Sequence, residues 1–212
     1  MFVSEIFLSI QGESTYAGLP CIFIRLAGCN LTCSWCDTSY AQVTEGSNEL
    51  KIDEIVKEVK RYNCRLVEIT GGEPLMQTDA GGLAKKLLDE GFRVLIETNG
   101  SVSLEGLDKR AVKIVDIKCP SSGHGGSFLL KNLDYLTSDD EVKFVIGDRN
   151  DYDGAKKFLE EYIKDRTVNV LFAPVRPALE PKALADWILN DSLRVRLQLQ
   201  LHTYIWDGER GR

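Results

Sequence analysis

The stretch CIFIRLAGCNLTCSWCDT, residues 21–38, joins an apolar run to a loop that carries three cysteines. The run CIFIRL, residues 21–26, is rich in the β-branched and aromatic residues of a buried strand. The loop that follows holds Cys29, Cys33 and Cys36 with the spacing C-x3-C-x2-C. Because loops after parallel barrel strands form the functional face of such folds, the stretch predicts a strand that delivers three thiols to that face.

Six further runs of the same kind follow along the chain. They are RLVEIT (65–70), RVLIET (93–98), KIVDIK (113–118), EVKFVI (141–146), VNVLFA (168–173) and VRLQLQLH (195–202). Apolar residues recur at helical spacing between several of them, in the windows 52–59, 80–88, 155–162 and 184–188. Strands that alternate with helices need crossover connections, so the sheet is predicted to be parallel.

The length of the chain limits the size of the barrel. A complete eight-stranded β/α barrel takes about 250 residues, whereas this chain has 212. We therefore expect the α/β class, as a shortened and partly open (β/α) barrel with about six core parallel strands. No internal repeat or proline-rich linker divides the sequence, so residues 1–212 are expected to form a single domain.

The composition restricts the partners of the chain. The formal net charge is −6 and there is no run of five like charges, so no nucleic-acid or membrane partner is predicted. Glu5 interrupts the N-terminal apolar segment, and no apolar run is long enough to span a membrane. The expected location is the cytoplasm, and the expected partner is a small molecule. Six cysteines in such a chain, three of them clustered, favour metal binding or catalysis over disulfides.

The cysteine cluster offers one ligand fewer than an ordinary metal site needs. A structural zinc site needs four ligands, and the sequence has no second C-x-x-C and no H-x3-5-H to supply the fourth. A cubane iron-sulfur cluster also normally takes four thiolates. Three thiolates would leave one iron open to a chelating small molecule.

The cysteine spacing, with Trp35 before the last cysteine and GGEP at 71–74, resembles the radical S-adenosylmethionine (radical SAM) superfamily. In that superfamily the amine and carboxylate of S-adenosylmethionine chelate the open iron. An electron from the 4Fe-4S cluster then releases a 5′-deoxyadenosyl radical, so the difficult chemistry belongs to the cofactor. GGEP alone is also compatible with a plain strand-to-helix turn, because glycine and proline are common there.

Longer motifs are similar to those of one family within it, the 7-carboxy-7-deazaguanine synthases of queuosine biosynthesis. The motifs are SIQGES (9–14), GCNLTCSWCDT (28–38), EITGGEP (68–74), ETNGS (97–101), DIKCPSSG (116–123), VKFVI (142–146), FAPV (172–175) and LQLQLH (197–202). The resemblance implies a carbon-nitrogen lyase that converts 6-carboxy-5,6,7,8-tetrahydropterin to 7-carboxy-7-deazaguanine by radical ring contraction and loss of ammonia. It also implies a homodimer, Mg2+ and an electron-donor protein such as flavodoxin or ferredoxin.

The resemblance assigns site residues position by position. Substrate contacts are implied for Ile10, Gln11, Gly12, Glu13, Arg25, Thr70, His202 and Arg212. Cofactor contacts are implied for Trp35, Cys36, Asp37, Gly72, Glu73, Cys119, Pro120, Ser121 and Gln200. The cluster ligands would be Cys29, Cys33 and Cys36, and the hydroxyl of Thr38 would bind magnesium. No side chain is given a catalytic role, because the radical is generated on the cofactor.

Several of these residues also have simpler interpretations. Arg25 can hold a substrate carboxylate bidentately or form an exposed salt bridge. Glu13 can accept from guanine-like N–H groups or belong to a polar loop. Thr70 can be a plain β-branched strand residue, and Asp37 a cap or turn residue.

The remaining cysteines and the C-terminal run are read from their patterns. Cys21 and Cys64 lack partner spacing and are expected to be packing residues, and Cys119 can be a small buried hydrophobe. In VRLQLQLH, leucines alternate with Gln198, Gln200 and His202. As a strand, this run would place its polar residues on one face, either toward the site or toward solvent.

Two departures and two alternative functions remain open. The family commonly has QGEG and HKY, whereas this chain has Ser14 and Thr203 at the last position of the first motif and the second position of the other. A glycyl-radical enzyme activase shares the cysteine spacing, and a non-catalytic metal-binding module would share the cluster. The motifs SIQGES and EITGGEP favour the pterin enzyme over the activase, whereas anaerobic reconstitution and spectroscopy would decide against or for the metal-binding module.

Overall fold

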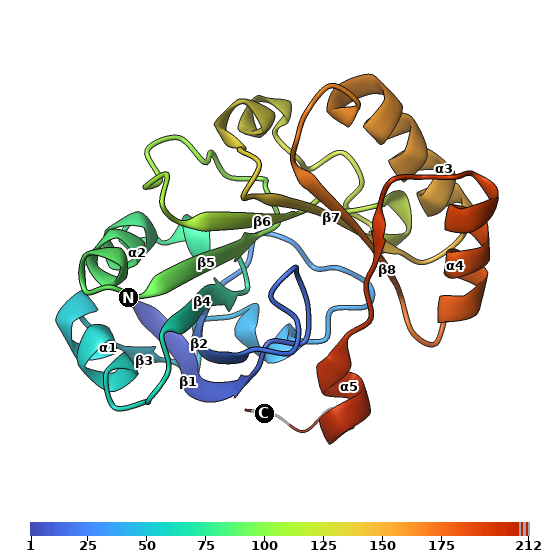
Figure 1. The fold of residues 1–212 in the computed structure, drawn as a ribbon. Coiled ribbons are helices and arrows are strands. Elements are labelled where there is room, and N and C mark those ends of the chain that lie inside the picture. Colours follow the sequence, from blue (N-terminus) through green and yellow to red (C-terminus); the bar gives the residue numbers. More distant parts are fainter. Residues whose placement is uncertain (208, 210, 212) are drawn as a thin grey trace.

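The computed structural model describes residues 1–207, 209 and 211. Its centre is a nine-stranded sheet with the order β3-β1-β2-β4-β5-β6-β7-β8-β9 (Figure 1). Within the described residues this order is linear, so the sheet does not close into a complete barrel. The strands are β1 (Phe2–Ile10), β2 (Pro20–Leu26), β3 (Asn48–Glu49), β4 (Leu66–Gly71), β5 (Arg93–Thr98), β6 (Val112–Asp116), β7 (Glu141–Ile146), β8 (Asn169–Pro174) and β9 (Arg196–Leu197).

Strands β2, β4, β5, β6, β7 and β8 pair in parallel, one beside the next. They confirm the predicted core of parallel strands and the partly open α/β barrel. Strand β1 was not among the predicted strands. It runs antiparallel to β2 and also pairs with β3, so it extends the sheet beyond its parallel part.

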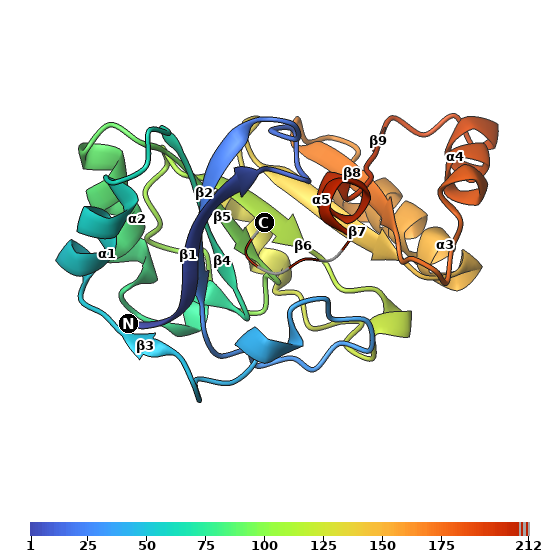
Figure 2. The ribbon, with the colours of Figure 1, turned by 90° about the horizontal axis from the view of Figure 1, so that it is seen from below.

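In the part of the chain that the structure describes, five α-helices accompany the sheet: α1 (Ile52–Val59), α2 (Ala80–Asp89), α3 (Arg149–Phe158), α4 (Pro181–Asn190) and α5 (Leu201–Trp206). A π-helical turn, Leu159–Ile163, continues α3. Helices α1 and α2 lie against one half of the sheet and α3 and α4 against the other (Figures 1 and 2). The first four helices confirm the windows that apolar spacing predicts, because those residues form the buried helix faces.

Alternation along the strands divides the sheet into two faces. On β7, Val142, Phe144 and Ile146 pack into the core beneath α3 and α4, while Lys143 and Val145 line a cavity on the other face. Successive side chains of a strand point to opposite faces, so one run of six residues serves both the helix layer and the cavity.

A small apolar cluster fills the cavity side of the sheet near the amino ends of the strands. Its buried members are Cys21, Phe23, Leu66, Leu95, Val112 and Ile114, and Cys64 packs against them. Cys21 is fully buried, in agreement with the packing role expected of it.

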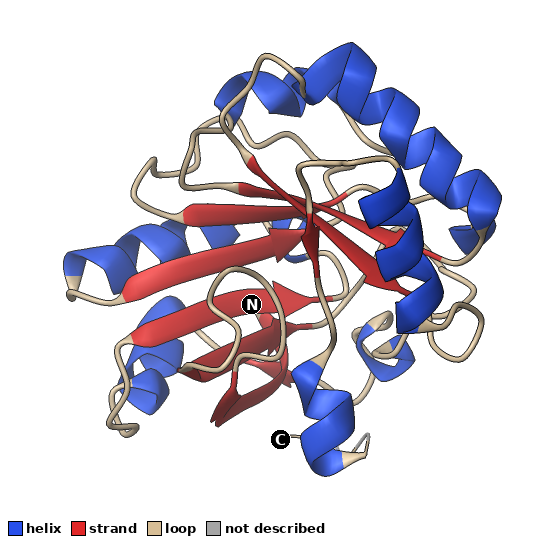
Figure 3. Ribbon diagram, turned by 45° about the vertical axis from the view of Figure 1, so that its right-hand side comes forward, coloured by secondary structure: helices blue, strands red, loops and turns tan. Residues whose placement is uncertain are grey.

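The C-terminal run was predicted to be one long strand, and that prediction is wrong. Strand β9 covers only Arg196–Leu197, and helix α5 begins at Leu201. Gln198 donates one more backbone hydrogen bond to Phe172, beyond which the ladder ends, and the backbone of Leu201 donates instead to Gly12. The chain therefore leaves the sheet edge and crosses toward the loop after β1 (Figure 3).

Among the described residues, no helix has both the length and the apolar character that crossing a membrane would require.

Candidate functional site

A cavity of about 630 Å³ opens at the carboxyl ends of the parallel strands. Most of the predicted site residues line it. They are Ile10, Gln11, Gly12, Glu13, Arg25, Cys29, Cys33, Trp35, Cys36, Asp37, Thr38, Thr70, Gly72, Gln200 and His202. Segments from both ends of the chain therefore meet around one space.

The loop that carries the cysteines is fixed by neighbouring backbone. The N–H groups of Gly28 and Cys29 donate to the carbonyls of Ala41 and Gln42, at 2.8 and 3.0 Å. Ser34 donates to Ser122 at 3.1 Å. These bonds hold both ends of the loop without using the thiols.

The three thiols face the same cavity and are half-buried. Burial raises the pKa values of the Cys29 and Cys33 thiols in the metal-free chain. A metal ligand must be the thiolate, so binding a metal here releases protons and overcomes that cost. Three soft sulfur donors in one loop fit an iron-sulfur cluster with an open position.

The GGEP turn is pressed against the exit of β2. A side chain on Gly71 would collide with the backbone of Leu26, and one on Gly72 with the carbonyl of Gly28. The N–H of Gly72 donates to the carbonyl of Leu26 at 3.1 Å. Both glycines are thus needed for packing the turn onto the cysteine loop, and contact of Gly72 with a cofactor stays a prediction.

Glu73 stabilises this turn through three hydrogen bonds. Its carboxylate accepts from the backbone N–H of Leu75 and Asn99, at 3.0 and 2.7 Å, and from the hydroxyl of Thr98 at 2.8 Å. Its side chain is buried and does not line the cavity. The structure therefore gives Glu73 a bracing role between β4 and β5, and its direct cofactor contact stays a prediction.

Glu13 contacts three polar side chains at the cavity. Lys143 Nζ is 2.9 Å from its Oε2, Gln200 Nε2 is 2.9 Å from its Oε1, and Gln198 Nε2 is 3.4 Å from Oε2. Gln200 also reaches Asp37 at 3.5 Å. Gln198 and Gln200 thus converge on the site, although they do so from an irregular segment and not from one face of a strand.

Arg25 forms an ion pair through the Nε edge of its guanidinium group. Its Nε donates to Glu5 Oε1 at 2.9 Å, and Tyr40 donates to the same oxygen at 2.6 Å. Glu5 stands directly opposite Arg25 in the antiparallel β1–β2 pair. The ion pair is largely buried, with side chains 16% and 15% exposed, so it is not the exposed surface salt bridge of the simpler interpretation.

Asp37, Thr38 and His202 form the outer part of the cavity. The Thr38 hydroxyl donates to Asp37 Oδ1. Ligand atoms of Glu13, Asp37 and His202 lie within 4.8 Å of one another. Magnesium prefers oxygen ligands, so the donors here that fit it are the carboxylates and the Thr38 hydroxyl.

A few predicted contacts lie elsewhere. Cys119 is buried in the core beneath α3, and neither it nor Pro120 or Ser121 lines the cavity. Ser121 instead donates to Asp151 at the start of α3. Their contacts with a cofactor stay predictions, and Arg212 lies outside the described residues.

The charged cavity residues that went unrecognised in the sequence include Glu68, Glu97, Asp116 and Lys143. Each lies in a strand of the parallel core or at its end. Burial, followed by the charges of Glu97 and Glu13, raises the pKa of Glu68 well above its usual value. A charged residue inside an otherwise apolar strand was the available signal, because such residues are rarely buried without a partner.

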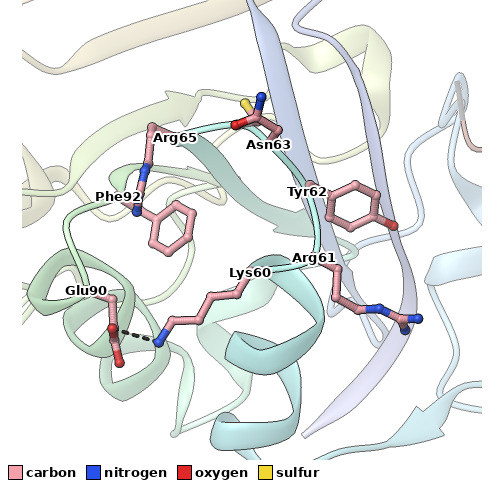
Figure 4. Close-up of a pocket in the computed structure, with 8 residues that line it drawn as sticks. Lys60, Arg61, Tyr62, Asn63, Arg65, Glu90 and Phe92 are labelled. Carbon is pink, nitrogen blue, oxygen red and sulfur yellow. Dashed lines mark ion pairs between the residues drawn. The ribbon is translucent and has the colours of Figure 1, made fainter.

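A second pocket, of about 520 Å³, lies at the opposite, amino ends of β4 and β5. Figure 4 shows Lys60 paired with Glu90 across its mouth, 2.7 Å apart, and Arg65 over the ring of Phe92. The Lys60 and Glu90 side chains are 47% and 34% exposed. The charges of this pocket are solvated, unlike those of the cavity.

Several known proteins are similar to this chain in sequence or in fold. A family model of the radical SAM superfamily matches residues 23–119. The chain is 46% identical to the 7-carboxy-7-deazaguanine synthase of Koribacter versatilis, over 99% of this chain and 98% of that protein. It is 43% identical to the protein of the same name from Chlorobaculum tepidum, over 98% of this chain and 94% of that one.

The fold is also similar to the crystal structure of QueE from Escherichia coli, with a TM-score of 0.77 and 25% identity. That match covers 94% of this chain and 93% of the other. Near-complete coverage in sequence and in structure, together with three thiols and the GGEP turn at one cavity, shows that the chain belongs to the 7-carboxy-7-deazaguanine synthase family of radical SAM enzymes.

Proposed function

We propose that this enzyme converts 6-carboxy-5,6,7,8-tetrahydropterin to 7-carboxy-7-deazaguanine with loss of ammonia, in queuosine biosynthesis. The observation that carries the proposal is that Cys29, Cys33 and Cys36 line the same cavity as Glu13 and Arg25. A cluster site therefore adjoins groups that can bind a guanine-like edge and a carboxylate. The named relatives, similar over nearly their whole length, support the same reaction.

The three cysteines would hold a 4Fe-4S cluster, and S-adenosylmethionine would lie along Trp35, Cys36, Asp37, Gly72 and Gln200. Bound together, cluster and S-adenosylmethionine supply the hydrogen-atom abstraction that starts the ring contraction. The chain itself binds, orients and shields the pterin. A hydrogen-abstracting reaction needs such shielding, because a closed site prevents side reactions.

The substrate would bind against Ile10, Gln11, Gly12, Glu13, Thr70 and His202. The carboxylate of Glu13 would accept from the N–H groups of the pyrimidine edge. The guanidinium of Arg25 would face the substrate carboxylate while its Nε remains on Glu5. The pterin would then span the cavity between two opposite charges.

Magnesium would take the Thr38 hydroxyl, with Asp37 as the neighbouring oxygen donor. The hydrogen bond between these two residues supports a shared site, because each already offers an oxygen to the same region. Magnesium keeps several waters and needs few protein ligands. His202 offers nitrogen and suits the pterin better than this ion.

We also propose that residues 1–212 act as one radical SAM domain, as a cytoplasmic homodimer reduced by a flavodoxin or ferredoxin. The shared sheet and the continuous cavity support one domain. The net charge of −6 supports a small-molecule substrate over nucleic acid.

The test is an anaerobic assay with a fully loaded and reduced cluster, S-adenosylmethionine, magnesium and the carboxytetrahydropterin. We expect the deazaguanine product by mass spectrometry, with ammonia in equal amount. Loaded enzyme that leaves the pterin unchanged would overturn the substrate assignment. Under those conditions, formation of a glycyl radical on an added protein would support the activase alternative.

A further inference from the structure

Lys143 of β7 has more anionic neighbours than a structural ion pair needs. Its Nζ contacts Glu97 Oε1, lies 2.9 Å from Glu13 Oε2 and lies 3.6 Å from Asp116 Oδ2. The side chain is 5% exposed, yet it lines the cavity. These three acids come from three different parts of the chain, so Lys143 is the point at which they are joined.

The other charges around this group also face the cavity. Glu68 of β4 lies close enough to Glu13 and Glu97 for their charges to raise its pKa, and Arg25 opposes that rise. Lys118, after β6, pairs with Asp116 at 2.8 Å. The outer members are Asp37 and His202. Glu141, on the same face of β7, accepts a hydrogen bond from Thr15. Burial raises the pKa of Glu141, and the charge of Lys143 opposes that rise.

A neighbouring strand supplies a matched structural ion pair. Lys113 of β6 lies 3.1 Å from Asp140, with side chains 3% and 1% exposed, and it does not line the cavity. Asp140 also accepts from Thr137 and from the backbone of Lys113. That pair is enclosed. Around Lys143, in contrast, Asp116 Oδ1 is buried with no hydrogen-bond partner among the described residues.

We propose that Lys143 is a positioning residue for the pterin: its ammonium holds the carboxylates of Glu13 and Glu97 side by side, as paired acceptors for the substrate's guanine-like N–H groups. The proposal rests on the function proposed above. Thr70 fixes the second carboxylate further, since its hydroxyl donates to Glu97 Oε2 at 3.1 Å. Lys143 acts through these two acids and needs no contact with the substrate.

The electrostatics give the direction of the effect. Burial alone would lower the pKa of Lys143, but Glu13, Glu97 and Asp116 outweigh it and hold that pKa well above its usual value. Lys143 is thereby held as the ammonium, the form that attracts both carboxylates. Without the ammonium, the two carboxylates would repel each other and lose the contacts that set their spacing.

The test compares Lys143→Met, Lys143→Arg and Lys113→Met, each as loaded enzyme with S-adenosylmethionine and no reductant. Pterin affinity is measured by anaerobic calorimetry near neutral pH. We expect Lys143→Met to weaken binding by about tenfold or more, because the two carboxylates lose their common partner. Lys143→Arg should stay within about threefold of wild type, because it keeps the charge.

Lys113→Met controls for loss of a buried ion pair, and it should lower stability without changing pterin affinity. Normal pterin affinity in Lys143→Met, or an equal loss in Lys113→Met, would overturn the proposal. If Lys143→Met does not fold, Lys143→Arg and Lys143→Gln keep it testable: equal binding by these two would contradict it.

Failure of this proposal and failure of the proposed function have different signatures. Loaded wild-type enzyme that binds no pterin would contradict the proposed function. Wild-type binding of the pterin, with equal affinity in Lys143→Met, would overturn the role of Lys143 alone.

Discussion

The two ends of the parallel strands carry pockets of similar size and different character. The pocket at the amino ends holds about 520 Å³ and the cavity at the carboxyl ends about 630 Å³. The amino-end pair of Lys60 and Glu90 is partly solvated, whereas Lys143 is almost fully enclosed. Burial of charge, and not volume, therefore marks the functional end, because a buried charge is retained only where it has partners.

The largest expected difference between the two ends concerns their cysteines. Cys33 lines the cavity and Cys64 the amino-end pocket. We expect Cys33→Ala to abolish cluster assembly, because only two thiolates of the triplet remain, and Cys64→Ala to leave it intact. Iron content and visible absorption after anaerobic reconstitution measure this, and equal iron in both variants would erase the distinction.

Carboxylates at the two ends provide the next contrast. Glu13→Gln keeps the shape of the side chain but removes its charge beside Lys143. We expect pterin affinity to fall by about tenfold to a hundredfold, the range of a lost charge-assisted hydrogen bond. Glu90→Gln is the matched control and should bind as wild type does. Calorimetry on the loaded enzyme decides, and a Glu13 variant with normal affinity would remove Glu13 from the substrate site.

A smaller effect is expected at the rim of the cavity. Thr38→Val is nearly isosteric and removes the hydroxyl that would bind magnesium. We expect turnover to fall about tenfold, with a weaker response to added magnesium. Thr167→Val, at an exposed position, is the control. Unchanged turnover and unchanged magnesium dependence would exclude Thr38 as a ligand.

The smallest expected effect is on the pH dependence of folding stability. This dependence should have opposite signs for a carboxyl at the cavity and a carboxyl at the amino-end pocket. The pKa of Glu68 is raised by burial, so its ionisation destabilises the fold as the pH rises above about 4. Glu68→Gln should therefore gain stability relative to wild type as the pH increases, by about 1 kcal/mol or more.

Glu90 behaves in the opposite way, because a hydrogen bond from Lys60 lowers its pKa. The stabilisation from Glu90 is present at neutral pH and is lost as the pH falls through the lowered pKa. Denaturant unfolding of Glu68→Gln and Glu90→Gln across this range measures both. The same pH trend in the two variants would show that the environments of these carboxyls do not differ as described.

Much of the fold follows from local pattern. The parallel strands and four helices were predictable because apolar residues recur with periods of two and of about 3.6 along those segments. The end of β9 was not predictable in this way, because it depends on the neighbouring strand β8, where Phe172 accepts the last backbone hydrogen bond of the ladder. Alternation in VRLQLQLH continues past that point and therefore misleads.

The candidate site was predictable where a motif carries the chemistry, as in the cysteine triplet. Partners set by tertiary structure were not. Glu5 opposes Arg25 only because β1 pairs antiparallel with β2. Lys143 contacts Glu13 across 130 positions of sequence, and no local spacing predicts such a meeting.

The contact between Gly12 and His202 has a consequence for how the enzyme is made. A side chain on Gly12 would overlap the His202 ring, and Leu201 donates to the Gly12 carbonyl at 3.0 Å. During synthesis the N-terminal loop and the cysteines emerge long before residues 198–206, because chains are made from the N-terminus. A ribosome-bound intermediate could thus carry its complete set of sulfur ligands while one wall of the substrate chamber is still untranslated.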